Sequence, residues 1–159
     1  MVVYRTLPKI RAEDLGLDDR QRVNARLGDH IRLLGYRLEA KEPSAGETVK
    51  VTLFWQPDDE LRGNYHVFVH LLDERGKLIT QHDGIPMWGE LPTWSWWKGE
   101  IVQDEHPLVL GENLPHGDYP LRVGMYDAAT MVRVPALTSA GESLPNDAVP
   151  LGIIEIGQE

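Results

Sequence analysis

Alternation of apolar and polar residues is the feature that most constrains how this chain folds. Between Thr48 and Gln56, every second residue is a large apolar one (Val49, Val51, Leu53 and Trp55), and the intervening residues are polar except for Phe54. Side chains alternate between the two faces of a strand, so this pattern predicts a half-buried strand with Trp55 in the core. The alternation recurs at 64–73 and 119–125, and no long apolar period of 3.6 residues is present. The chain is therefore expected to be all-β.

Turn residues separate the alternating segments and define further strands. These are expected at 22–27, 31–40, 77–83, 100–110, 131–134 and 151–156. Short strands joined by tight turns are typical of an antiparallel two-sheet sandwich, here of immunoglobulin-like topology. We expect a sandwich domain over residues 22–157, preceded by an irregular leader or linker over residues 1–21, in which a short helical turn could form.

The segment Asp73–Lys77 is expected to form a hairpin with Gly76 in the left-handed conformation. The simplest register for this hairpin places four residues on one face of the sheet: Phe68, His70, Thr80 and His82. His70 and His82 would then be diagonal neighbours, with Asp83 on the opposite face. Such histidines, with Asp104 or His106, are too loosely spaced to predict a metal site.

Composition and charge exclude several kinds of chemistry and disfavour several kinds of partner. The chain has no cysteine, which excludes disulfides and thiolate chemistry, and its net charge of -9 disfavours nucleic acids and anionic membranes as partners. No apolar run is long enough to span a bilayer. The first residues lack the charged segment followed by an apolar segment that is typical of a signal peptide. Neither a nucleophile paired with a base nor a phosphate-binding loop is recognisable, so we expect no catalytic residues and no cofactor. The acidic run at 58–60 is expected to be a solvated loop.

The long segment 84–98 carries four of the five tryptophans, namely Trp88, Trp94, Trp96 and Trp97. An indole offers a flat apolar face on which the C–H face of a sugar ring can stack. Nearby carboxylates that could accept hydrogen bonds from sugar hydroxyls are Glu90, Glu100 and Asp104. The alternative is that the indoles fold back and close one end of the sandwich. At least one exposed indole is expected if the segment recognises a ligand.

Several short sequence motifs between Val23 and Ile156 are similar to those of a known module. They include VFVHLLD at 67–73, QHDG at 81–84 and VGMYD at 123–127. Together they resemble the immunoglobulin-like β-sandwich at the C-terminus of bacterial membrane glycosyltransferases of the dolichyl-phosphate-mannose–protein mannosyltransferase type. The resemblance implies an extracytoplasmic location and a membrane glycosyltransferase domain as a partner. It transfers no catalytic residue, because those of the parent enzymes lie in their membrane domain.

The sequence thus predicts a non-catalytic accessory domain that binds carbohydrate and is associated with a membrane glycosyltransferase. The alternative function is a structural or protein-docking module without a small-molecule ligand. A glycan or a glycosyltransferase domain is the expected partner, and direct membrane insertion is not expected.

Overall fold

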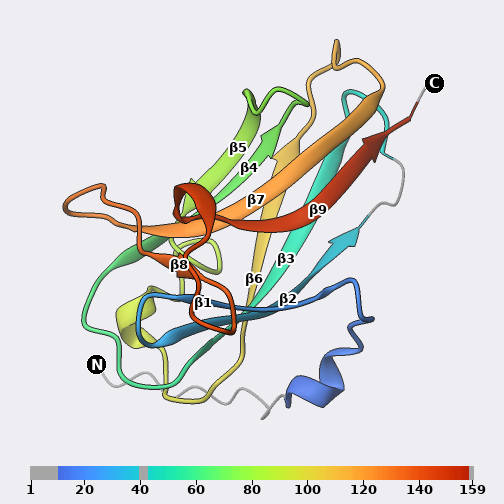
Figure 1. Ribbon diagram of the computed structural model, residues 1–159. Coiled ribbons are helices and arrows are strands. Elements are labelled where there is room, and N and C mark those ends of the chain that lie inside the picture. Colours follow the sequence, from blue (N-terminus) through green and yellow to red (C-terminus); the bar gives the residue numbers. More distant parts are fainter. Residues whose placement is uncertain (1–10, 40–42, 158–159) are drawn as a thin grey trace.

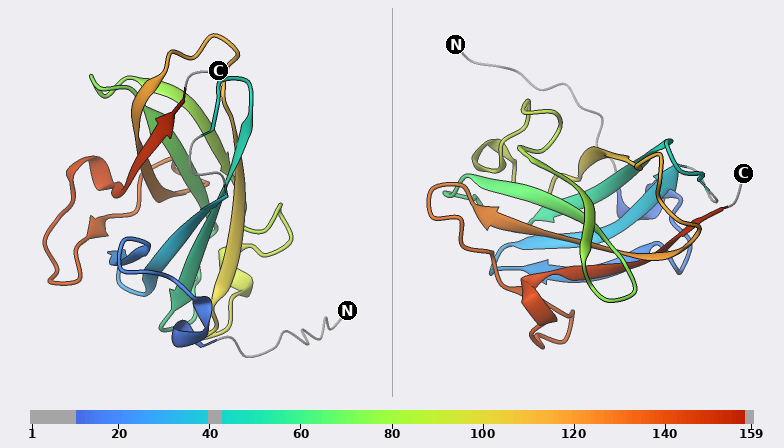
Figure 2. Two further views of the ribbon diagram at one scale, coloured as in Figure 1. Left: turned by 90° about the vertical axis from the view of Figure 1, so that its right-hand side faces the viewer. Right: turned by 90° about the horizontal axis from the view of Figure 1, so that it is seen from above.

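The computed structural model describes residues 11–39 and 43–157, which form a sandwich of two antiparallel sheets (Figure 1). One sheet has the strand order β6-β3-β2-β1-β8 and the other has the order β5-β4-β7-β9. Seen from above, the sheets are two stacked layers (Figure 2). The strands are β1 (Arg22–Leu27), β2 (Ile31–Glu39), β3 (Thr48–Pro57), β4 (Tyr65–Leu72), β5 (Leu78–Gly84), β6 (Val102–Val109), β7 (Gly117–Asp127), β8 (Ala136–Leu137) and β9 (Val149–Ile156).

The predicted all-β sandwich is confirmed. In the described residues, helical structure is limited to three short 3-10 turns: η1 (Ala12–Leu15), η2 (Thr93–Ser95) and η3 (Pro145–Asp147). Within the same ranges, no helix is long and apolar enough to cross a membrane. The immunoglobulin-like topology stays a prediction.

The core lies between the inner faces of the two sheets. The alternating residues of β3 point into it, and Trp55 is completely buried, as its sequence position predicted. Opposite them lie the alternating residues of β4 and β7, which are Val67, Val69, Leu71, Leu121, Val123 and Met125. Burial of these side chains from both layers supplies the main stabilisation of the domain.

The N-terminal segment packs on the outer face of the first sheet. Phe54, which breaks the polar side of the β3 pattern, is buried there by Leu15, Leu17 and Ile101. A Cβ at position 35 would lie only 2.4 Å from the carbonyl oxygen of Gln21, so glycine allows the segment to approach β2 closely. The second half of the expected leader, from residue 11 onward, is therefore in contact with the sheet, whereas residues 1–10 lie outside the described part.

The register of the β4–β5 hairpin differs from the prediction. Gly76 has the expected left-handed conformation (φ 82°), but Ile79 is an additional bulged residue in β5. His82 consequently pairs with Val69 and faces the core, whereas His70 pairs with Gln81 on the outer face. One extra residue moves every following side chain to the other face. The predicted placement of both histidines on one face is therefore wrong.

The segment 131–134 is not the strand that we predicted. Asp127 Oδ1 accepts hydrogen bonds from the backbone N–H groups of Ala129 and Thr130, which turns the chain, and Met131 has a positive φ of 64°. Only Arg133 makes an isolated bridge, to Tyr126. The edge strand of this region is instead the two-residue β8, which is too short to produce an alternating pattern.

Candidate functional site

The tryptophan-rich segment is the connection from β5 to β6 (residues 85–101), referred to below as the β5–β6 loop. Both strands are at the edge of their respective sheets, so the loop crosses from one layer of the sandwich to the other. In Figure 2 it projects from one side of the sandwich. Its position is set by the two strand ends that it joins.

The four indoles of this loop divide into two groups. Trp88, Trp94 and Trp97 are 63%, 61% and 50% exposed, whereas Trp96 is only 3% exposed. The Nε1–H group of Trp96 donates a hydrogen bond to the carbonyl oxygen of Leu91, at 2.9 Å. Trp96 thus closes the sandwich beneath the loop, and the other three indoles present large apolar surfaces to solvent.

A buried carboxylate fastens the first half of the loop. Asp104 is fully buried, and its Oδ1 accepts a hydrogen bond from the backbone N–H of Met87, at 2.9 Å. Its Oδ2 lies 3.2 Å from Nε1 of Trp55 and 2.5 Å from Nε2 of His106. A buried carboxylate needs such partners, because an unpaired charge in the interior is strongly unfavourable. Asp104 is therefore enclosed by donors of the protein, and the expectation that it faces sugar hydroxyls is wrong.

A pair of histidines continues this chain of hydrogen bonds towards the surface. Nδ1 of His106 lies 2.8 Å from Nδ1 of His82. Because Nε2 of His106 donates to Asp104, Nδ1 of a neutral His106 accepts and Nδ1 of His82 donates. Burial lowers the pKa of His82, and His106 lowers it further, against the opposing effect of Asp104 and Asp83. The other edge of His82 meets the ring of Trp88, with the centroids 6.1 Å apart.

The backbone beside this anchor is strained. Met87 and Trp88 have φ angles of 56° and 58°, and Gly89 follows with 85°. Positive φ is easy for glycine but unfavourable for large side chains, at about 1–3 kcal/mol for each residue. The hydrogen bond from Met87 to Asp104 helps to hold this conformation, which leaves Trp88 largely in solvent.

The second half of the loop is tied to the connection between β3 and β4. The buried hydroxyl of Thr93 donates to the carbonyl oxygen of Gly63 (2.9 Å) and accepts from the backbone N–H of Tyr65 (3.0 Å). The backbone N–H of Gly99 donates to the carbonyl oxygen of Pro57, at 2.7 Å. Trp94 and Trp97 therefore lie on a segment that is fixed at both of its ends.

The two remaining predicted acceptors lie in the same loop region. Glu90 is exposed, two residues after Trp88. Glu100 is half-buried, and its Oε1 accepts a hydrogen bond from the backbone N–H of Trp97, at 2.6 Å. Both carboxylates thus accompany an exposed indole, and Glu100 also holds the backbone that carries Trp97.

The remaining histidines and acidic residues named from the sequence do not assemble into a site in the described part of the chain. His70 Nε2 lies 3.8 Å from Asp83 Oδ1 on the outer face of the second sheet, away from His82 and His106. In residues 11–39 and 43–157, no three His, Cys, Asp or Glu side chains are grouped so that they could hold a metal ion. Asp58 of the acidic run is exposed and pairs with His30, at 3.0 Å.

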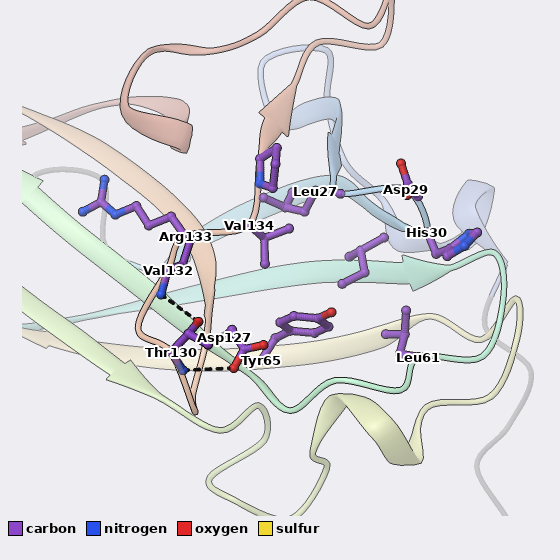
Figure 3. A pocket seen from close by; sticks show the side chains of 13 residues that line it. Leu27, Asp29, His30, Leu61, Tyr65, Asp127, Thr130, Val132, Arg133 and Val134 are labelled. Atoms are coloured by element: carbon purple, nitrogen blue, oxygen red, sulfur yellow. Dashed lines mark hydrogen bonds between the residues drawn. The ribbon is translucent and has the colours of Figure 1, made fainter.

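A cleft that the sequence did not predict lies at the end of the sandwich (Figure 3). It has a volume of about 350 Å³ and lies between the β1–β2 turn, the β3–β4 connection and the segment after β7. Its residues come from three separated stretches of the chain (27–31, 61–65 and 127–135) and show no common spacing. Leu27, Ile31 and Tyr65 lie in strands that the sequence predicted, but no pattern in the sequence connects the three.

Comparisons with known proteins bear on the fold. No protein-family model matches the chain, and no curated protein matches it either. Among solved structures, the crystal structure of the C-terminal domain of wzt has a similar fold, with a TM-score of 0.61 and 10% sequence identity. The match covers 85% of this chain and 78% of that chain. The chain is therefore a β-sandwich domain similar to that C-terminal domain, and the comparisons do not extend to the glycosyltransferase module that the sequence resembles.

Proposed function

We propose that this domain is a non-catalytic carbohydrate-binding module whose binding surface is the β5–β6 loop. The observation that carries the proposal is the exposure of Trp88, Trp94 and Trp97 on a loop that is fastened from below. Each indole has a flat apolar face on which the C–H face of a pyranose ring can stack. A fixed loop loses little conformational entropy on binding, which favours affinity.

Polar groups for sugar hydroxyls accompany the indoles. Glu90 and Glu100 carry carboxylate oxygens, and each carboxylate offers several acceptor positions. Oε1 of Glu100 accepts a hydrogen bond from the backbone N–H of Trp97, so this carboxylate lies directly beside an exposed indole. A neutral sugar presents an apolar C–H face and hydroxyl groups. The exposed indoles suit the first, and the neighbouring carboxylates suit the second.

The arrangement of the acid–base groups supports a binding role rather than a catalytic one. Asp104 and His106 are 0% and 1% exposed, and their functional atoms bond to one another, to Trp55 and to the loop backbone. A general acid or base must reach a proton of the substrate within hydrogen-bond distance. The same groups instead hold Met87, and through it the position of Trp88.

The resemblance to glycosyltransferase modules supports a more specific proposal about the location of the domain and its partner enzyme. We propose that the domain accompanies a membrane glycosyltransferase on the extracytoplasmic side and holds its glycan close to that enzyme. Affinity purification of the full-length protein from crosslinked native membranes tests this association. Recovery without any glycosyltransferase would contradict the association and leave carbohydrate binding as a separate question.

A glycan array probed with the wild-type domain and with Trp88→Ala, Trp94→Ala and Trp97→Ala tests the binding function. Loss of signal in at least one tryptophan variant, with the fold retained by circular dichroism, is the expected result. Ile153→Ala is the matched control, because Ile153 is 57% exposed on β9 outside the loop. Absence of any glycan binding by the wild type would favour the protein-docking alternative, since tryptophan is also enriched in protein interfaces.

A further inference from the structure

The cleft at the end of the sandwich has an apolar floor with an aromatic ring across it. Leu27, Ile31, Leu61 and Val134 line it, and the ring of Tyr65 lies among them (Figure 3). Its volume of about 350 Å³ is near the lower end of the range for ligand pockets, roughly 300–1,000 Å³. A cleft of this size accommodates one or two sugar rings, and Tyr65 supplies a flat surface for one of them.

Several polar groups at the cleft retain capacity for a ligand. In the described part of the chain, the hydroxyl of Tyr65 and the carboxylate of Asp29 take part in no hydrogen bond or ion pair. Asp29 is exposed and Tyr65 half-buried. Thr130 adds a hydroxyl, which accepts a hydrogen bond from the backbone N–H of Val132. Donor and acceptor groups at the rim of an apolar cleft are what fixes a ligand's orientation.

The charge around the cleft selects against anions. Of the two basic residues that line it, His30 pairs with Asp58, at 3.0 Å. Arg133 extends away from the cleft, where its guanidinium lies 4.4 Å from the centre of the Phe68 ring and donates to the carbonyl oxygen of Asn146. Asp29 and Asp127 therefore dominate the rim, and the whole chain has a net charge of -9. A neutral hydroxyl-bearing ligand fits this environment, whereas an acidic sugar is repelled.

The cleft and the β5–β6 loop are joined through one short contact. The backbone N–H of Tyr65 is bonded to the hydroxyl of Thr93, and Trp94 is the next residue. The β3–β4 connection lies between the two features, tied to the loop at Gly63 and to the β1–β2 turn at Asp58. An exposed indole and the cleft thus flank the same connection at the same end of the sandwich.

We propose that the cleft is a second subsite, which takes a neutral sugar unit of the same glycan that stacks on Trp94. The inference rests on the proposed carbohydrate-binding function and extends it: the ligand is a neutral oligosaccharide or polysaccharide that spans both places. A disaccharide would occupy the loop alone, whereas longer fragments would reach Tyr65 and gain affinity from the second contact.

Titration calorimetry with neutral dextran, galactan and mannan fragments of graded length tests this extension. The cleft variants are Tyr65→Phe, which removes only the hydroxyl, and Asp29→Asn. Each is expected to weaken binding of long fragments about tenfold, as for loss of one good hydrogen bond, and to leave disaccharide binding unchanged. Trp94→Ala should weaken both. Tyr126→Phe and Asp118→Asn are the matched controls, because Tyr126 bonds to His66 on the outer face and Asp118 lies at the opposite end of β7.

The outcomes separate the two proposals. If the cleft variants bind every length like the wild type while Trp94→Ala weakens binding, the second subsite is wrong and the loop function stands. If no fragment binds the wild type, the carbohydrate-binding function fails, and the second subsite with it. If polygalacturonate binds as tightly as the neutral fragments, the selection against anionic sugars is wrong.

Discussion

Asp104 and Trp55 are hydrogen-bonded to each other in the interior of the sandwich, with Oδ2 of the carboxylate 3.2 Å from Nε1 of the indole. The same carboxylate receives the backbone N–H of Met87, the residue before the exposed Trp88. The core strand β3 and the β5–β6 loop are therefore connected by one side chain. The packing of the core and the position of the proposed binding surface are expected to depend on each other.

Truncating Trp55 should destabilise the fold severely. Trp55→Ala removes a fully buried indole and is expected to lower the free energy of unfolding by about 3–5 kcal/mol. Trp55→His, which keeps a ring N–H, is expected to cost less. Urea denaturation followed by circular dichroism measures both. A loss below about 1 kcal/mol for the alanine variant, the range of ordinary substitutions, would contradict the assigned role of Trp55.

Removing the carboxylate should release the loop as well as weaken the core. Asp104→Ala leaves three donors without their acceptor, and the two buried ones, on Trp55 and His106, are expected to cost about 1–3 kcal/mol each. Hydrogen exchange at the amide of Met87 should accelerate relative to amides in β7. Asp118→Asn, on the surface, serves as the control. Unchanged protection of Met87 in a folded Asp104→Ala protein would show that the loop is held by other contacts.

Stability should fall as the pH drops below about 6.5, the ordinary pKa of histidine. Burial lowers the pKa of both His82 and His70 in the folded protein. Between the ordinary and the lowered pKa, the unfolded chain binds more protons, so the free energy of unfolding increases with pH in that window. Burial raises the pKa of Asp83, which has the opposite effect at lower pH.

Measuring unfolding in urea at a series of pH values checks this dependence. The wild type should lose stability on acidification from pH 7, and His82→Gln should show a shallower slope over the same range. The His70→Gln variant separates the contribution of the outer face from that of the His82–His106 pair. Equal slopes for the wild type and both variants would refute the assignment.

The alternation of the sequence was sufficient to predict much of the fold. It placed Trp55 in the core and identified β3, β4 and β7, because burial on one face of a strand imposes a period of two. It did not show the bulge at Ile79, since an extra residue leaves no mark on local composition. That single bulge decided which face His82 occupies.

Within the candidate site, composition indicated the correct loop but not the role of each residue. Trp96 and Trp97 are adjacent and chemically identical, yet one is buried and the other half exposed. In the sequence, nothing distinguishes Asp104 from other carboxylates in strands. Its role is evident only from the folded structure, in which Trp55, Met87 and His106 all donate hydrogen bonds to it. Such convergence is a tertiary property that a strand pattern does not encode.

Position 88 offers a test of the backbone strain. Trp88→Gly places a residue that tolerates positive φ at a φ of 58°, so it should leave the melting temperature unchanged or raise it. Trp88→Val should lower the melting temperature, because a β-branched residue is unfavourable in that conformation. If the glycine variant is less stable than the wild type, contacts of the indole outweigh the strain of the backbone at this position.

Chelation should not affect the protein. The described His, Asp and Glu side chains form no group suited to a metal ion, so EDTA is expected to leave the melting temperature unchanged. A drop of several degrees, reversed by adding a divalent cation, would show that the folded protein holds a structural metal.

The most direct test of the central claim follows the five indole N–H signals by NMR while a glycan identified on the array is added. Each signal is assigned by a single Trp→Phe substitution. We predict that the signals of Trp88, Trp94 or Trp97 shift with increasing glycan, whereas those of the buried Trp55 and Trp96 stay in place. Shifts confined to Trp55 and Trp96, or no shift while the glycan binds, would contradict recognition by the β5–β6 loop.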